Sequence, residues 1–428
     1  MNHFDIGSIV LTLSVLLATA HIVGYIFERM RQPRLVGEII AGLILGPFVL
    51  GKTSAPIFQR LFGESNHINP QQIILNFIYW VGLFLLMFLS GSETRRILAK
   101  ENRRETLWLF GVGTSLPFCI VLGLSYIGAI HLHQLSGPTQ NLTSTALILA
   151  IAVAVTSIPV ISRIFIDLGI IKTRFASLIL SFAVLEDIVL WGVLAIATGI
   201  TATNIGETSL AGTVARHTLT TFAFMLTGLT LLPILLKKIH KTRWNLLIKA
   251  SPIGYIFFLL FLYTALAHAL DVNLVFAAFL AGFGLVGGMS GNQRHLFSSH
   301  LESISKVSFG GFIPIYFAMV GYKLTLNSSF SLPLFLEFLF GSSAIVIACF
   351  LFAAHLAGFR GLDALNLAIT KNARGGPGIV LASVALDAGI INASFYTTLV
   401  ITAILTSQFA GTWLRYIISK KWPLLSSS

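Results

Sequence analysis

Charged residues are what this sequence has least of. Asp, Glu, Lys and Arg together make up 10% of its 428 residues, against roughly 25% in soluble domains. Hydrophobic residues make up 55%. This balance excludes an ordinary water-soluble domain and favours a chain that lies in a lipid bilayer. A membrane-spanning helix needs about 20 mainly apolar residues, and about thirteen such stretches follow one another along the chain. The sequence therefore predicts an all-α polytopic membrane protein.

Cysteine is nearly absent as well. Cys119 and Cys349 both lie inside apolar stretches, which argues against a disulfide framework and against a metal-binding cluster. The sequence contains no phosphate-binding Gly-Lys-Ser/Thr loop, which disfavours an ATP-driven pump or a membrane enzyme. No long polar tract divides the chain. We therefore expect one membrane transporter domain over 1–428, with no soluble regulatory domain, no cofactor and no enzymatic activity.

Basic residues outnumber acidic ones, 28 to 16. When the apolar stretches are threaded through a membrane, most of the Lys and Arg residues fall in loops on one side. Loops rich in Lys and Arg face the cytoplasm. The distribution predicts an external N-terminus, a cytoplasmic C-terminus and an odd number of spans. The positive charge therefore orients the protein in its membrane, and it gives no reason to expect a nucleic-acid partner.

Helix-breaking and polar residues interrupt two of the apolar stretches, at Val155–Pro159 and at Asn372–Gly378. The stretch after each break carries polar residues in turn, Glu186-Asp187 and Thr406–Gln408. By our count the two interrupted stretches run in opposite directions, as an inverted repeat requires. Interrupted helices at corresponding positions of two halves indicate the binding site of a transporter. The alternative is that Pro and Gly merely kink two long helices.

The stretch 175–200 has only two charged residues, the neighbours Glu186 and Asp187. A carboxylate at the centre of a bilayer costs at least ~2.5 kcal/mol, so such an acid indicates a functional site. Burial and a neighbouring like charge both favour the neutral form of a carboxyl group, which lets a proton compete with a cation. Oxygen ligands suit a hard cation such as Na⁺ or Li⁺. In the purely structural alternative, one acid only pairs with a base such as Arg374.

Other residues at the breaks complete the candidate site. Thr156 and Ser157 can supply hydroxyl or freed carbonyl oxygens, although Ser and Thr also pack between membrane helices without binding an ion. Arg374 can pair with an acid, balance helix-end dipoles or move with the cation. If it lies near the inner surface, it can extend to the headgroups instead. Asn372 and Pro159 are expected to shape the breaks.

Several motifs resemble those of the monovalent cation:proton antiporter-2 superfamily, the Kef-type and Na⁺/H⁺ exchanger membrane domain. The first, RQPRLVGEIIAGLILGP at 31–47, is similar to the signature of the family's second helix. The others follow in the family's order, at Gly82–Gly91, Ala154–Pro159, Ala277–Gly282, Pro314–Gly321 and Asn372–Gly375. Each fragment alone is weak evidence, but their order and spacing are specific, and they cover nearly the whole chain.

The resemblance implies a homodimer in a bacterial inner (plasma) membrane, with inverted repeats, two crossed broken helices and elevator-like alternating access. It implies that Asp187 binds the cation and the proton, with Thr156 and Ser157 nearby. The function implied is exchange of Na⁺ or Li⁺ for H⁺, in the service of pH homeostasis. The resemblance also implies a division of the helices into a moving core at approximately 105–200 and 331–417, a scaffold or dimerisation part at 5–90 and 249–324, and a linker at 214–236.

Two departures leave the transported ion and the stoichiometry open. Relatives often have Asp-Asp, Asn-Asp or Gln-Asp where this chain has Glu186-Asp187. Electrogenic relatives often have a mid-membrane lysine in the span before Arg374, whereas 342–354 has no basic residue. We therefore expect Glu186 to lack a lysine partner. K⁺/H⁺ exchange is the main alternative function, and a channel or a proton-coupled exporter of another solute is a more distant one.

Overall fold

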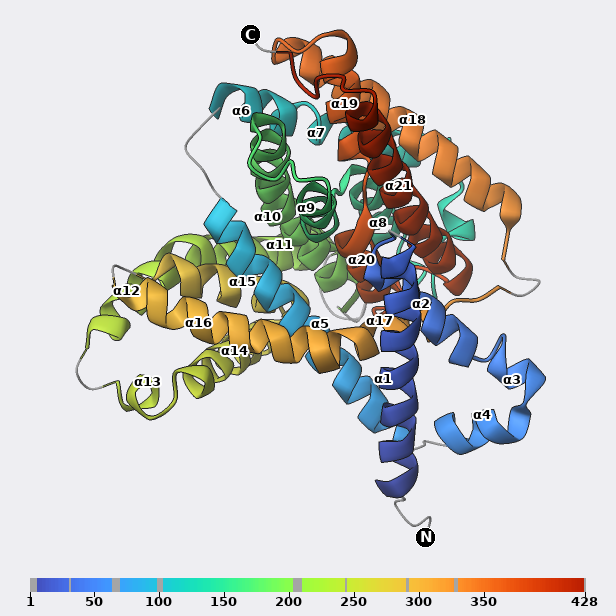
Figure 1. Ribbon diagram of the computed structural model, residues 1–428, viewed down its shortest axis with the longest axis vertical. Coiled ribbons are helices and arrows are strands. Elements are labelled where there is room, and N and C mark those ends of the chain that lie inside the picture. The colour runs from blue at the N-terminus through green and yellow to red at the C-terminus, as the bar shows by residue number, and fades with distance from the viewer. Residues whose placement is uncertain are drawn as a thin grey trace. The chain divides into compact units, whose positions relative to one another are not determined.

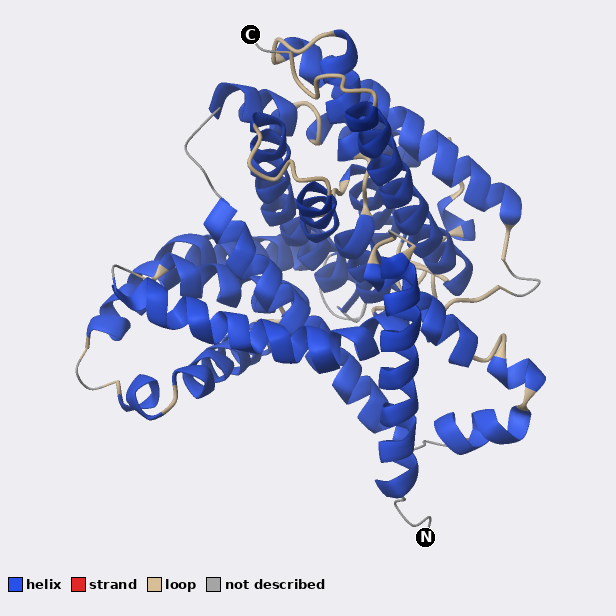
Figure 2. Ribbon diagram, in the orientation of Figure 1, coloured by secondary structure: helices blue, strands red, loops and turns tan. Residues whose placement is uncertain are grey.

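The computed structural model describes residues 6–30, 32–63, 70–97, 103–202, 210–242, 245–289, 292–326 and 330–426. Within these ranges the regular structure is helical, and the only β-type pairing is an isolated bridge between Ser136 and Ile391 (Figure 2). Ten of the described helices are long and apolar enough to cross a membrane. The predicted all-α polytopic membrane fold is confirmed.

The chain forms two compact units. The first unit consists of residues 1–92, 226–267 and 277–329, and the second unit of residues 93–225, 268–276 and 330–428. The helices that lie wholly or mainly in the first unit are α1 (Ile6–Arg29), α2 (Arg34–Leu45), α3 (Leu50–Thr53), α4 (Ala55–Phe62), α5 (Pro70–Ile97), the π-helical turn Thr227–Leu231, α12 (Leu232–Lys241), α13 (Leu246–Ala250), α14 (Pro252–Ala269), α15 (Leu274–Gly287), α16 (Asn292–Val307), the π-helical turn Ser308–Phe312 and α17 (Ile313–Tyr322) (Figure 1).

The second unit contains the remaining helices. They are α6 (Arg103–Gly111), α7 (Ser115–Tyr126), a short 3₁₀ turn (Leu132–Gln134), α8 (Leu142–Ala154), α9 (Ile158–Asp167), α10 (Arg174–Ala202), α11 (Leu210–Leu226), α18 (Leu332–Leu356), α19 (Gly361–Lys371), α20 (Gly375–Asp387) and α21 (Ala393–Ser419).

Three apolar stretches of the sequence are not among the ten long helices. One is the shorter helix α15, and the other two are the interrupted pairs α8–α9 and α19–α20. The interruptions lie where the helix-breaking residues predict them, after Ala154 and after Lys371. The total number of membrane crossings stays a prediction, as does the division into a moving core and a scaffold.

Glycines bring helices of the first unit into close contact. A Cβ atom built on Gly42 of α2 would lie 1.7 Å from the carbonyl oxygen of Ala318 in α17, and one on Gly321 would lie 1.8 Å from that of Ile39. Gly91 of α5 and Gly282 of α15 make the same kind of approach to each other's helix. Small residues allow membrane helices to pack backbone to backbone. These four glycines belong to the sequence motifs, so packing explains their presence there.

The second unit contains one helix pattern twice. The interrupted pair α8–α9 is followed by the long helix α10, and the interrupted pair α19–α20 is followed by the long helix α21. Two of these helices have asparagine caps. The side chain of Asn141 accepts a backbone N–H at the start of α8, and the side chain of Asn392 accepts one at the start of α21. In Figure 1, α20 and α21 run side by side.

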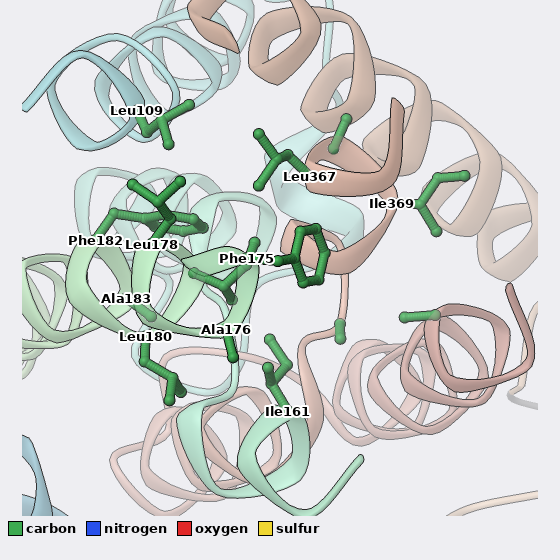
Figure 3. Close-up of a cluster of buried hydrophobic side chains, with 14 of the residues drawn as sticks. Leu109, Ile161, Phe175, Ala176, Leu178, Leu180, Phe182, Ala183, Leu367 and Ile369 are labelled. Atoms are coloured by element: carbon green, nitrogen blue, oxygen red, sulfur yellow. The ribbon is translucent and has the colours of Figure 1, made fainter. Parts of the chain in front are cut away.

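A buried apolar cluster joins the two halves of this pattern. Figure 3 shows Leu109 of α6, Ile161 of α9, Phe175 of α10 and Leu367 of α19 converging. The chain after α21 folds back onto the same region. There the backbone N–H of Ser426 donates to Asp363 Oδ2 at 2.8 Å. The first half of the second interrupted helix, α19, is therefore packed firmly against its neighbours.

Candidate functional site

The two helix breaks meet inside the second unit and satisfy each other's backbone. The N–H of Ser157 donates to the carbonyl of Ala373 at 2.8 Å, and the hydroxyl of Thr156 donates to the carbonyl of Lys371 at 2.9 Å. The N–H of Gly375, which the break leaves without a helical partner, donates to the hydroxyl of Ser407 on α21 at 3.0 Å. Backbone groups released by a break inside a membrane need such partners. The two interruptions are therefore one structural feature.

Gly375 is where the breaks come closest. It has φ +35°, and a Cβ atom there would lie 2.5 Å from Val160 Cγ2 and 2.6 Å from Ser157 Oγ. Both the backbone conformation and the lack of space favour glycine.

We expect Gly375→Ala to force the two breaks apart, and to lower both the yield of folded protein and transport. Size-exclusion chromatography and flux assays measure the two effects. Gly376→Ala is the matched control, because a Cβ atom at the neighbouring Gly376 meets nothing within 4 Å. Equal behaviour of the two variants would contradict this role for Gly375.

The acid pair lies on α10, opposite the breaks. Glu186 and Asp187 have no exposed surface. Glu186 Oε1 is 2.7 Å from Nζ of Lys371, which is equally buried. The same ammonium donates to Thr156 Oγ1 at 2.7 Å and to the carbonyl of Ala154, the last residue of α8. Lys371 therefore ties the acid on α10 to both broken helices.

The expectation that Glu186 lacks a lysine partner is wrong. The lysine was expected in 342–354, which lies on α18, whereas the structure supplies it from the end of α19. Lys371 was visible in the sequence as a basic residue inside an apolar stretch, directly before the second break. Only the meeting of the two breaks brings it to Glu186.

Asp187 differs from Glu186 in its hydrogen bonding. In the part of the chain that the structure describes, neither of its carboxylate oxygens has a hydrogen-bond partner. Adjacent residues of a helix point in different directions, so Asp187 does not share the contacts of Glu186. An ionised carboxylate buried without a partner is very unfavourable. Asp187 is therefore the member of the pair whose buried carboxylate no described hydrogen-bond donor satisfies.

Thr114 is a site residue that the sequence argument missed. It lies in a third, smaller interruption, between α6, which ends at Gly111, and α7, which begins at Ser115. Its hydroxyl donates to Glu186 Oε2 at 3.1 Å. A Gly-Val-Gly-Thr sequence inside an apolar stretch is the only signal that could have suggested it.

Arg374 lies at the second break but has no acidic partner among the described residues. Its side chain is buried, donates to Asn372 Oδ1 at 3.3 Å, and lies over the ring of Phe338 at 5.5 Å. Burial excludes the alternative in which it extends to the inner surface. Ser157 caps α9 by accepting from the N–H of Val160, while Pro159 lies in the first turn of that helix and its side chain falls outside the described part.

This combination of features defines a class of protein. Interrupted helices that meet at buried ionisable groups, inside an all-helical membrane fold, are typical of ion-coupled secondary transporters. The chain belongs to the sodium/hydrogen exchanger transmembrane family, whose model matches residues 16–420.

Individual relatives are similar over nearly the whole chain. It is 27% identical to the Na⁺/H⁺ antiporter NhaS4 of Synechocystis sp., with 94% of this chain and 96% of the relative covered. It is 23% identical to the Na⁺/H⁺-K⁺ antiporter GerN of Bacillus cereus, with 97% and 98% covered. The K⁺/H⁺ antiporter 1 of Saccharomyces cerevisiae is 27% identical over 94% of this chain, which spans 45% of the yeast protein.

A solved structure has the same fold. The sodium/proton antiporter MjNhaP1 of Methanocaldococcus jannaschii matches with a TM-score of 0.66 at 16% identity, covering 96% of this chain and 98% of that protein. The predicted resemblance to the cation:proton antiporters is confirmed, and with it the general function of a cation/H⁺ antiporter in a membrane.

Proposed function

We propose that this protein exchanges Na⁺ or Li⁺ for H⁺ at Asp187, by elevator-type alternating access within a homodimer. The observation that carries the proposal is the contrast between the two acids. Glu186 is paired with Lys371, whereas Asp187 is fully buried with no partner among the described residues. Asp187 can bind one cation or one proton, and each ligand removes the cost of its buried charge.

Competition for one carboxylate accounts for coupling. If the unit that carries Asp187 changes its exposure only when the acid is occupied, a cation moving one way must be followed by a proton moving the other way. The candidate oxygen ligands for the cation are those of Thr156 and Ser157, at the break that Lys371 joins to α10. A hard monovalent cation suits such ligands.

K⁺/H⁺ exchange is the second candidate. It is supported by the similarity to GerN, whose name includes both Na⁺ and K⁺, and to the yeast K⁺/H⁺ antiporter. The proposal further places the N-terminus outside, the C-terminus in the cytoplasm and the protein in the bacterial inner membrane, with pH homeostasis as its role. It includes no enzymatic activity.

Transport in proteoliposomes tests the proposal. Purified protein is reconstituted with an imposed pH gradient, and Na⁺, Li⁺, K⁺ and choline are added in separate runs while a fluorescent dye reports the internal pH. We expect Na⁺ and Li⁺ to dissipate the gradient, and choline to leave it intact. Dissipation by K⁺ alone would favour the second candidate, and failure of all three metal ions would overturn the antiporter assignment at this site.

A further inference from the structure

The interruption between α6 and α7 presents a side chain to the acid pair. Thr114 is 3% exposed and occupies the position before the first residue of α7. Its backbone angles are helical, the N–H of Leu116 donates to the carbonyl of Val112, and the next residue, Pro117, has no N–H. The start of α7 therefore offers the side chain of Thr114 no N–H to cap. Its hydroxyl donates to Oε2 of Glu186 on α10.

Packing around the neighbouring Gly113 fixes this geometry. A Cβ atom on Gly113 would lie 2.5 Å from the ring of Phe350 on α18. The ring of Phe350 packs in turn against Phe182, at 5.0 Å between centroids, and Phe182 lies one helical turn before Glu186 on α10. Phe350 therefore packs between Gly113, which precedes Thr114, and Phe182, which precedes Glu186 by one turn of α10. The absence of a side chain at Gly113 therefore lets the segment that carries Thr114 lie close to Phe350.

The two carboxylate oxygens of Glu186 accept hydrogen bonds from different donors. Oε1 accepts from Lys371 and Oε2 accepts from Thr114. Hydrogen bonds donated to a carboxylate favour its ionised form. Asp187, one residue further along, has no donor in the described part of the chain.

We propose that Thr114 is a positioning residue that holds Glu186 ionised in its pair with Lys371 and so confines proton exchange to Asp187. This inference rests on the proposed function, because it assigns different tasks to the two acids of the same site. Without the hydroxyl of Thr114, Glu186 would take up a proton more readily, and a second proton would enter the transport cycle.

Three variants test the inference. Thr114→Val keeps the shape and removes the donor, whereas Thr114→Ser keeps the donor. Thr264→Val is the matched control, because Thr264 is a buried threonine whose hydroxyl bonds only to carbonyls of its own helix, α14.

Transport against pH in proteoliposomes is the first readout. Removing a donor from an ionised carboxylate favours the protonated form, so a proton binds at higher pH. In Thr114→Val the acid limb of the profile should move to higher pH by about one to two units, which corresponds to the loss of one hydrogen bond to a charged group. Thr114→Ser and Thr264→Val should keep the original profile. A uniform loss of rate at every pH in Thr114→Val, or an equal shift in Thr114→Ser, would overturn the inference.

Infrared titration is the second readout, and it needs no transport. The carboxyl stretching band of purified protein reports how much acid is protonated at each pH. Thr114→Val should gain protonated carboxyl at a pH where the parent protein has none. That gain should disappear when Glu186→Gln is added. If the gain in protonated carboxyl persists, Thr114 does not act on Glu186. In that case the role proposed for Thr114 fails, whether or not the parent protein exchanges Na⁺. If the parent protein exchanges no cation, the proposed function fails, and the infrared result still decides the role of Thr114.

Discussion

Lys371→Met should lower the free energy of unfolding by about 3–5 kcal/mol, because it leaves the carboxylate of Glu186 buried without its cation. The pair has no exposed surface, and its two atoms are 2.7 Å apart. Methionine has about the length of the lysine side chain, so the loss of charge dominates over the loss of volume. The apparent unfolding temperature of the purified protein in detergent measures the effect.

A double variant separates the pair from general damage to the core. Adding Glu186→Gln to Lys371→Met removes the unpaired charge, and we expect it to restore most of the lost stability. Lys306→Met is the matched control. Lys306 and Glu302 form an ion pair of similar length, 2.8 Å, but with side chains 75% and 67% exposed. Exposed pairs contribute little to stability, because water and salt screen them. Equal destabilisation at the two lysines would mean that the buried pair has no special role.

Asp187→Asn should reduce cation-driven proton flux to the level of protein-free liposomes, while the protein still folds. The substitution keeps the size of the side chain and removes the only group of the buried pair that has no partner of its own in the described chain. Asparagine does not ionise, so proton and cation no longer compete for a charge. The flux assay measures the first effect, and size-exclusion chromatography the second.

Asp387→Asn is the control for this variant, because Asp387 is an exposed acid at the end of α20. Its substitution should leave transport unchanged. If Asp187→Asn transports as well as the parent protein does, the exchange site lies elsewhere, and the contrast between the two acids has no functional meaning.

The positions of the helix breaks could be predicted from local sequence. Proline and clustered glycines in an apolar stretch weaken a helix wherever the stretch packs, so Val155–Pro159 and Asn372–Gly378 coincide with the ends of α8 and α19. Burial of the acid pair was equally predictable, because an apolar stretch of this length leaves Glu186 and Asp187 near its middle. Both predictions depend only on neighbouring residues.

The partners of the acids could not be predicted in the same way. Arg374 was a reasonable candidate on charge alone, yet its guanidinium bonds to Asn372 and lies over Phe338. Lys371, three residues earlier, reaches Glu186 instead. Lys371 is the last residue of α19, whereas Arg374 lies beyond the break, directly before α20. The path of the chain through the break therefore decides which of the two bases points at the acid.

The sequence by itself determined that this is an all-α membrane protein with two opposed helix breaks and a buried acid pair. Composition and local helix-breaking residues are enough for that. Only the tertiary structure decided that Glu186 is held by Lys371 and Thr114, which lie 185 and 72 positions away in the chain, while Asp187 has no partner in the described residues. Such pairings depend on how helices from the two halves cross, and no property of a single helix specifies a crossing.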